Sequence, residues 1–194
     1  MRKSLLFVWA CMGLVCLVSA CKTSVKSKEW KLVWVENFDQ KNSFDESVWT
    51  KIPRGTSDWN NYMSYYDSCY AMQDGNLILR GIANHTQKND TAPYLTGGVY
   101  TKGKKLFTGG RVEVCARLQA AKGAWPAIWM LPEKAEWPKG GEIDIMERLN
   151  HDRIAYQTTH SYYTHVLGIK DNPPHGGINK INPEEYNIYS VDIY

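Results

Sequence analysis

Short stretches of alternating apolar and polar residues recur along this chain, and turn-forming pairs separate them. A period of two residues is typical of strands, whereas no segment of helical length shows a period of 3.6. The pattern predicts an all-β protein, with polar loops at 85–96 and 165–183. The turn signals are Asp74-Gly75, Gly97-Gly98, Gly109-Gly110, Gly140-Gly141, Pro173-Pro174 and Gly176-Gly177.

One predicted strand carries three carboxylates, Glu142, Asp144 and Glu147, with apolar residues as its spacers. Inward-facing carboxylates on a strand are costly unless they do chemistry or bind a cation. The alternative is a helix that begins with acidic residues in its first turn. The preceding Gly140-Gly141 pair and the two isoleucines favour the strand.

Strand parity places Glu142 and Asp144 on one face and Glu147 on the other. A β-bulge at Ile145 or Met146 would return Glu147 to the shared face. The glutamates would then be roughly 13 Å apart along the backbone, at about 3.3 Å per step. A concave sheet must therefore bring them to the about 5–5.5 Å that retaining glycosidases use. Three close carboxylates cannot all ionise cheaply, so one pKa must rise, and a raised pKa suits a glutamate that acts as an acid.

Tryptophan and tyrosine dominate the aromatic residues, with 8 Trp and 12 Tyr against 4 Phe. The segment 123–132 alternates, which places Trp125 and Trp129 on one face and Ile128 and Met130 on the other. Indole rings beside carboxylates form stacking platforms for the apolar faces of pyranose sugars. The alternative is that both tryptophans belong to the core.

These segments resemble glycoside hydrolase family 16. The run Glu-Ile-Asp-Ile-Met-Glu is similar to its Glu-x-Asp-x-x-Glu motif in the bulged, laminarinase-like form. The resemblance spans residues 30–194 and implies a β-jelly-roll sandwich, of the concanavalin A-like lectin and glucanase type, with a concave substrate cleft. Other similar segments, in the family's order, are 30–34 through 38–39, 74–79, 97–104, 110–114 and 125–132.

The resemblance also implies roles for the carboxylates. Glu142 would be the nucleophile, Glu147 the general acid and then the general base, and Asp144 would hold the charge and orientation of the nucleophile. Thr158 and His160 share a face and resemble the family's Thr-x-His strand, so His160 would support Asp144 electrostatically. The alternative for His160 is an ordinary core or surface histidine.

No catalytic metal and no cofactor are expected, because no two histidines have metal-ligand spacing. The family resemblance adds only a structural calcium on the convex side of the sandwich. The four histidines in loop-like stretches are given no role, namely His85, His151, His165 and His175.

The laminarinase-like form implies an endo-acting enzyme on β-1,3- or mixed β-1,3/1,4-glucan. Related members act on β-linked galactose in galactans or mucin-type glycans. Trp59 and Asn61, together with residues 165–182, would line the minus subsites. The alternative class of function is an inactive glycan-binding lipoprotein. A binding module, however, has no need of three crowded carboxylates.

The first 28 residues predict where in the cell the protein is located. Arg2-Lys3 precedes an apolar run at 5–18, and Leu17-Val18-Ser19-Ala20-Cys21 resembles a bacterial lipobox. We therefore expect a signal peptide at 1–20, a lipidated Cys21, a tether at 21–28 and the catalytic domain at 29–194. The protein would be an outer-membrane lipoprotein of the cell envelope, periplasmic or surface-exposed. The alternative is an ordinary secretory signal.

A net charge of +3, without a basic stripe among the aromatics, excludes a nucleic-acid reader. Cys69 and Cys115 would form one disulfide or remain two buried thiols in an oxidising compartment. The printed sequence stops at Tyr194 within an alternating strand, where relatives continue. We therefore expect a partial jelly roll of reduced activity. We also expect the protein to be a monomer.

Overall fold

The computed structural model describes residues 30–119 and 121–194. Its contacts divide the chain into two units, Met1–Lys31 and Leu32–Tyr194, and every described strand belongs to the second. The predicted signal peptide, Cys21 and the tether lie outside the described residues. Among the residues that are described, no helix is long and apolar enough to cross a membrane.

The described chain is almost entirely β-structure, as the alternating pattern predicts. The helical segments are a 3₁₀ turn at Asp67–Cys69 and a π-helical turn at Tyr162–Val166. The strands are β1 (Thr50–Lys51), β2 (Tyr70–Gln73), β3 (Asn76–Leu79), β4 (Gly81–Ala83), β5 (Tyr94–Thr96), β6 (Val99–Tyr100), β7 (Gly110–Ala116), β8 (Ala127–Met130), β9 (Glu142–Glu147), β10 (Ile154–His160), β11 (Gly176–Lys180) and β12 (Asn187–Ile193).

Local turn chemistry explains the β2–β3 hairpin. Gln73 pairs with Asn76 across a two-residue loop, and Asp74 and Gly75 both have positive φ, 52° and 69°. A tight hairpin turn needs positive φ at both central residues, which Asp-Gly supplies at low cost. The predicted strand at 74–79 therefore starts at Asn76, after its turn.

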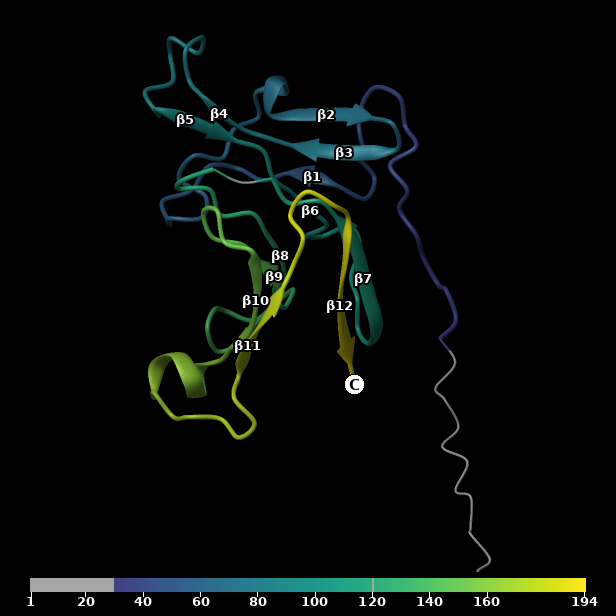
Figure 1. The fold of residues 1–194 in the computed structure, drawn as a ribbon, viewed down its shortest axis with the longest axis vertical. Coiled ribbons are helices and arrows are strands. Elements are labelled where there is room, and N and C mark those ends of the chain that lie inside the picture. The colour runs from purple at the N-terminus through teal and green to yellow at the C-terminus, as the bar shows by residue number, and fades with distance from the viewer. Residues whose placement is uncertain (1–29, 120) are drawn as a thin grey trace, which may run out of the picture. The chain divides into compact units, whose positions relative to one another are not determined.

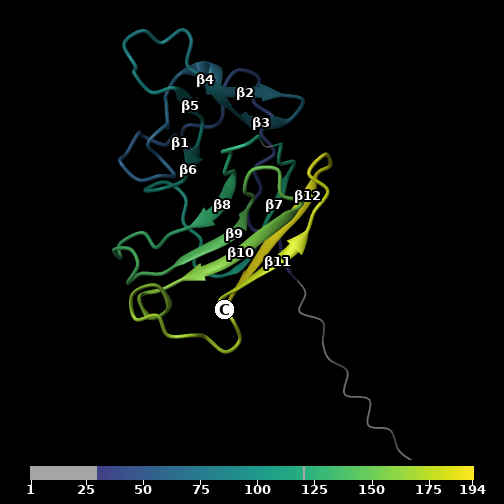
Figure 2. The same ribbon diagram turned by 60° about the vertical axis from the view of Figure 1, so that its left-hand side comes forward.

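Four antiparallel strands form the main sheet, in the order β11-β10-β9-β8, and β12 pairs with β7 in a second layer. Figure 2 shows β9, β10 and β11 side by side. The ribbons of β7 and β12 lie beside those of β8 to β11 in Figure 1. The core between the two layers contains Ile145, Met146, Ala155, Tyr189 and Leu118. This two-layer packing is the predicted sandwich.

Three predicted segments differ from the structure. The predicted loop at 85–96 ends in β5, which pairs with β4. No strand is assigned to residues 30–39, although the family resemblance predicts one there. The predicted loop at 165–183 contains β11, which pairs with β10 over five residues. Its run Gly-Gly-Ile-Asn-Lys has little β-propensity, so only pairing with β10 makes it a strand.

Both described cysteines are free, so the Cys69–Cys115 disulfide is absent. Cys69 is buried, as one of the two alternatives predicts, whereas Cys115 is exposed. Cys115 lies on the outward face of β7, whose residues alternate between half-buried and exposed. The expectation of two buried thiols is therefore wrong for Cys115.

Candidate active site

The acidic strand contains the predicted bulge, and Ile145 is the extra residue. Facing β8, Met146 lies opposite Ile128 and Asp144 lies opposite Trp129. The register with β10 skips at the same place, between Tyr156 and Thr158. Directly opposed residues share a face of the sheet, so the bulge returns Glu147 to the face of Asp144.

A glycine controls the entry into this strand. Gly141 has φ of 81°, and a Cβ at this position would lie 3.4 Å from the carbonyl oxygen of His160. Any other residue would be strained here, because positive φ is costly for residues with a side chain. Gly141 thus lets the chain turn directly into Glu142, which pairs with His160.

Each of the three carboxylates contacts one ring nitrogen. Nε1 of Trp137 donates to Oε2 of Glu142 at 2.6 Å, and Nε1 of Trp125 donates to Oε1 of Glu147 at 2.8 Å. Nε2 of His160 lies 3.1 Å from Oδ2 of Asp144. The arrangement holds both glutamates by one oxygen and leaves the other oxygen of each for chemistry.

Asp144 is the buried member of the cluster, with 6% of its surface exposed. Burial first, and then the charges of Glu147 and Glu142, together raise its pKa from 3.8 to about 7. The sequence predicts a raised pKa in this cluster but expects it on a glutamate. The pKa of Asp144 is raised because its side chain is buried and lies between two other carboxylates.

The two predicted tryptophans, Trp125 and Trp129, both lie near the carboxylates, but only Trp129 belongs to a strand. Trp129 is opposite Asp144 in the ladder and shares its face. Trp125 precedes β8, so the prediction that both tryptophans alternate along one strand is wrong for Trp125. Its indole reaches Glu147 from the preceding turn and is 47% exposed. Neither tryptophan is a buried core residue.

Trp59 lies edge-on to Trp129, with ring centroids 4.9 Å apart. It belongs to a turn in which the backbone N–H of Asn61 donates to the carbonyl of Ser57. The side-chain oxygen of Asn61 is buried and has no hydrogen-bond partner among the described residues. Buried side-chain oxygens usually have a hydrogen-bond partner, so this oxygen is a candidate acceptor for an ordered water or a ligand hydroxyl.

Sequence reasoning missed Trp137 and His165. The Trp137 ring lies 4.5 Å from the ring of His165, and His165 lies 6.2 Å from His160. The available signal was the tryptophan five residues before Glu142, next to the Gly140-Gly141 turn. No such signal marks His165, because it comes from the π-helical turn after β10. His165 therefore lies beside His160 and Trp137, although the sequence gives it no role.

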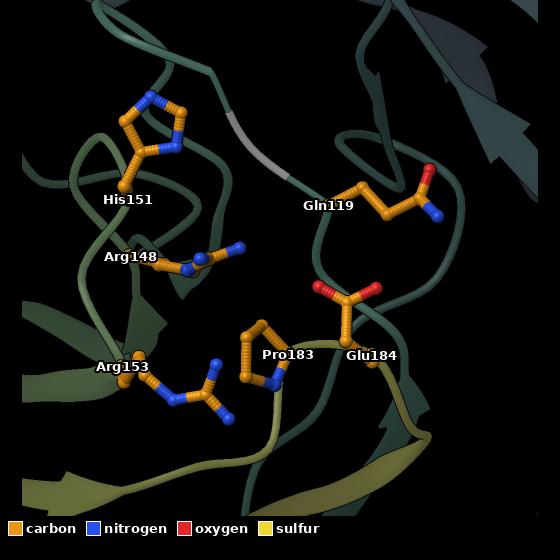
Figure 3. A pocket seen from close by; sticks show the side chains of 6 residues that line it. All are labelled: Gln119, Arg148, His151, Arg153, Pro183 and Glu184. Atoms are coloured by element: carbon orange, nitrogen blue, oxygen red, sulfur yellow. The ribbon is translucent and has the colours of Figure 1, made fainter.

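A separate pocket of about 500 Å3 lies where β9 ends, and none of the predicted site residues lines it. Arg148 follows Glu147 but is buried, and it donates to the backbone carbonyls of Leu118 and Asp152. Figure 3 shows the Glu184 carboxylate across from the two arginines, so the pocket has mixed charge. The lining residues are Gln119, Arg148, His151, Arg153, Pro183 and Glu184.

The described residues offer no obvious metal centre. Within 30–119 and 121–194, no group of three or more His, Cys, Asp and Glu is placed to hold a metal ion. Hard cations such as calcium take six to eight oxygen ligands. Backbone and amide carbonyl oxygens are also calcium ligands, so the structural calcium that the resemblance implies stays a prediction.

Comparison with known proteins places this geometry in context. The model of the XgeA-like, catalytic GH16 domain matches residues 68–185. The keratan-sulfate endo-1,4-beta-galactosidase of Sphingobacterium multivorum is 37% identical over 87% of this chain and 40% of its own length. A beta-glucanase of Rhodothermus marinus is 29% identical over 99% of this chain and 68% of its own length.

The fold is shared with solved laminarinases. The X-ray structure of the laminarinase from Rhodothermus marinus superposes with a TM-score of 0.73 at 29% identity, covering 86% of this chain and 68% of that one. This chain thus spans less than half of the galactosidase and about two thirds of the glucanase.

Proposed function

This chain belongs to glycoside hydrolase family 16, and from that premise we propose that it is an endo-acting, retaining β-glycan hydrolase. The proposed substrate is β-1,3- or mixed β-1,3/1,4-glucan. The observation that carries the proposal is the bulged β9, which presents Glu142, Asp144 and Glu147 on one face. The similarity to a beta-glucanase and to a laminarinase structure supports the choice of glucan.

In the first step, Glu142 attacks the anomeric carbon of the bound sugar and forms a glycosyl-enzyme ester. Glu147 gives its proton to the glycosidic oxygen as that bond breaks, and the leaving sugar departs. The Trp137 N–H holds Glu142 in place through Oε2, so Oε1 is the attacking atom. The Trp125 N–H occupies Oε1 of Glu147, so Oε2 carries the proton.

In the second step, the ionised Glu147 takes a proton from water, and the hydroxide attacks the ester. The sugar leaves with its original β-configuration, and Glu142 is regenerated as a carboxylate. The imidazole of His160 lies 3.1 Å from the carboxyl group of Asp144, beside Glu142. A proton on this pair keeps the charge of the cluster low while Glu142 holds its own negative charge.

Tryptophans border the carboxylates and supply the sugar platforms. Trp129, with Trp59 against its edge, offers an apolar ring face on the carboxylate side of the sheet. Asn61 supplies a buried oxygen without a partner among the described residues. We propose that these three residues bind the sugars on the non-reducing side of the cleaved bond.

Endo-β-galactosidase activity on galactans or mucin-type glycans is the second candidate. It is favoured by the 37% identity to a keratan-sulfate endo-1,4-beta-galactosidase. Gluco- and galacto-configured sugars differ at one hydroxyl, so the same catalytic residues serve either substrate. An inactive glycan-binding protein is the third, and the complete set of carboxylates argues against it.

A glycan panel tests the function. The full chain would be incubated with laminarin, barley mixed-linkage glucan, agarose, keratan sulfate and mucin, and products separated by size. Short oligosaccharides from laminarin or barley glucan support the proposal. Products from the galactose polymers alone would instead support the second candidate, an endo-β-galactosidase. An active laminarinase is assayed in parallel as the positive control. If this chain bound a glycan but cleaved none at any pH, the proposal that it is an enzyme would be rejected.

We further propose that Cys21 is lipidated and that the domain is tethered to the outer membrane as a monomer. The proposal is supported by the lipobox-like residues 17–21 and the Ser- and Lys-rich 22–28. Metabolic labelling with a palmitate analogue tests it, with Cys21→Ser as the matched control. Equal labelling of both proteins would contradict the anchor.

A further inference from the structure

Two side chains hold the bulge in β9 from the neighbouring strands. Nε2 of Gln157, in β10, donates to the carbonyl oxygen of the bulged Ile145 at 3.0 Å. Nδ2 of Asn179, in β11, donates to Oε1 of the same Gln157 at 2.7 Å. Side-chain hydrogen bonds thus connect three strands at the position where the backbone register slips.

The register explains why Gln157 can reach the bulge. Gln157 lies in the β10 step where the pairing with β9 skips a residue. Its partner on β11 is Gly177, which has no side chain, and a Cβ there would meet nothing within 4 Å. The amide therefore has room to lie along the sheet toward Asn179, its diagonal neighbour two residues beyond Gly177.

Gln157 lies on the face of the sheet away from the carboxylates. Thr158 and His160 share the face of Asp144 and Glu142, and Gln157 alternates with them. Gln157 also borders a hollow of about 300 Å3, which is lined by residues of β9, β10 and β12 and by the start of β11. A glycan on the carboxylate face therefore does not contact Gln157.

We propose that Gln157, oriented by Asn179, is a positioning residue that fixes the bulge and with it the spacing of Glu142 and Glu147. The proposal rests on the proposed hydrolase function. A bulge interrupts the ladder, so its geometry is less constrained by backbone pairing than a regular strand. Loss of the bulge would turn Glu147 to the opposite face, because side chains alternate. A displacement of about 1 Å at a catalytic group can reduce the rate about 100-fold.

The substitution Gln157→Met tests this, because methionine has a similar length but cannot donate to Ile145. We expect kcat on laminarin to fall about 10- to 100-fold while KM changes less than about twofold. Asn179→Ala, on an exposed residue, should lower kcat in the same direction by a smaller factor. Thr159→Val is the matched control on the same face of β10, and its kcat should stay near that of the parent chain.

Leaving-group dependence separates positioning from general damage. Glu147 lies beyond the bulge, so misplacing it impairs protonation of a poor leaving group most. Gln157→Met should therefore lose several-fold more activity on laminarin than on a dinitrophenyl glycoside of the same sugar. Equal losses on both substrates, or unchanged kcat in both Gln157→Met and Asn179→Ala, would overturn the inference while leaving the hydrolase intact.

A second readout does not depend on hydrolysis. Carbon-13 NMR titration follows the Asp144 carboxyl, whose pKa is raised first by burial and then by the nearby charges of Glu147 and Glu142, both of which change if the bulge moves. We expect the titration midpoint to move by at least about half a unit in Gln157→Met and to stay in place in Thr159→Val. An unmoved midpoint in Gln157→Met would reject the positioning role even if the parent chain cleaved no glycan.

Discussion

Nε1 of Trp137 donates a 2.6 Å hydrogen bond to Oε2 of Glu142, five residues further along the chain. The two residues flank the Gly140-Gly141 turn, so the turn folds the indole back over the first residue of the acidic strand. A hydrogen bond to a charged group fixes its orientation and contributes about 1.5–3 kcal/mol. Trp137 thus acts directly on the proposed nucleophile.

Trp137→Phe removes this hydrogen bond and keeps an aromatic ring. We expect kcat to fall about 10-fold, because losing about 1.4 kcal/mol in the transition state has that effect. Steady-state kinetics on laminarin would measure it. Trp49→Phe is a matched control, because the Trp49 indole donates to Oε2 of Glu36 at 3.1 Å, away from the acidic strand. Equal kcat values for the two variants would contradict the role of Trp137.

Substitution of the two glutamates should separate their roles. Glu147→Gln should lose most activity on laminarin, on the order of 1000-fold, but retain more on a dinitrophenyl glycoside that needs no acid. Glu142→Gln should lose both activities, because no nucleophile remains. Stopped and continuous assays of both substrates measure this, with Glu133→Gln, on an exposed loop, as the control. Near-parental turnover by Glu142→Gln would refute the assignment.

The stereochemistry of the product follows from the bulge. If the bulged strand brings the carboxyl groups to about 5–5.5 Å, the reaction retains the β-configuration. Proton NMR during the first minutes of laminarin hydrolysis should show the β-anomer, with the α-anomer appearing later by mutarotation. Release of the α-anomer first would instead indicate an inverting enzyme and a wider carboxyl separation.

Asp144 should make the protein less stable as pH rises. Its native pKa is about 7 against 3.8 for the free group, so between these values the native state holds a proton that the unfolded chain has lost. This contribution is complete below about pH 4 and is lost as pH rises through about 7. We expect the free energy of unfolding to fall from pH 5 to pH 8 by about 1–3 kcal/mol more than in Asp144→Asn.

Urea unfolding at several pH values, followed by tryptophan fluorescence, measures this difference. Asp67→Asn is the control, because a hydrogen bond from Lys51 lowers the pKa of the Asp67 carboxyl, outside the same pH window. That variant should keep the loss of stability seen in the parent chain. A parallel pH dependence in Asp144→Asn and the parent would show that Asp144 is not the titrating group.

The sequence by itself determined the acidic strand and its bulge. Alternation along a strand is a covalent property, so the spacing of Glu142, Asp144 and Glu147 already requires one extra residue if all three share a face. The Asp74-Gly75 turn could also be predicted from local sequence, because it depends only on the backbone conformations that these two residues can adopt. The alternation of Thr158 and His160 likewise placed the histidine on the face of Asp144.

Only the tertiary structure decided which distant residues meet these carboxylates. β11 is a strand because β10 pairs with it, and this pairing brings Asn179 to Gln157, 22 positions apart. Trp137 and His165 meet because the β8–β9 and β10–β11 connections lie at the same end of the strands, which no periodicity encodes. The pKa of Asp144 is raised by burial and neighbouring charge, and both depend on packing in three dimensions.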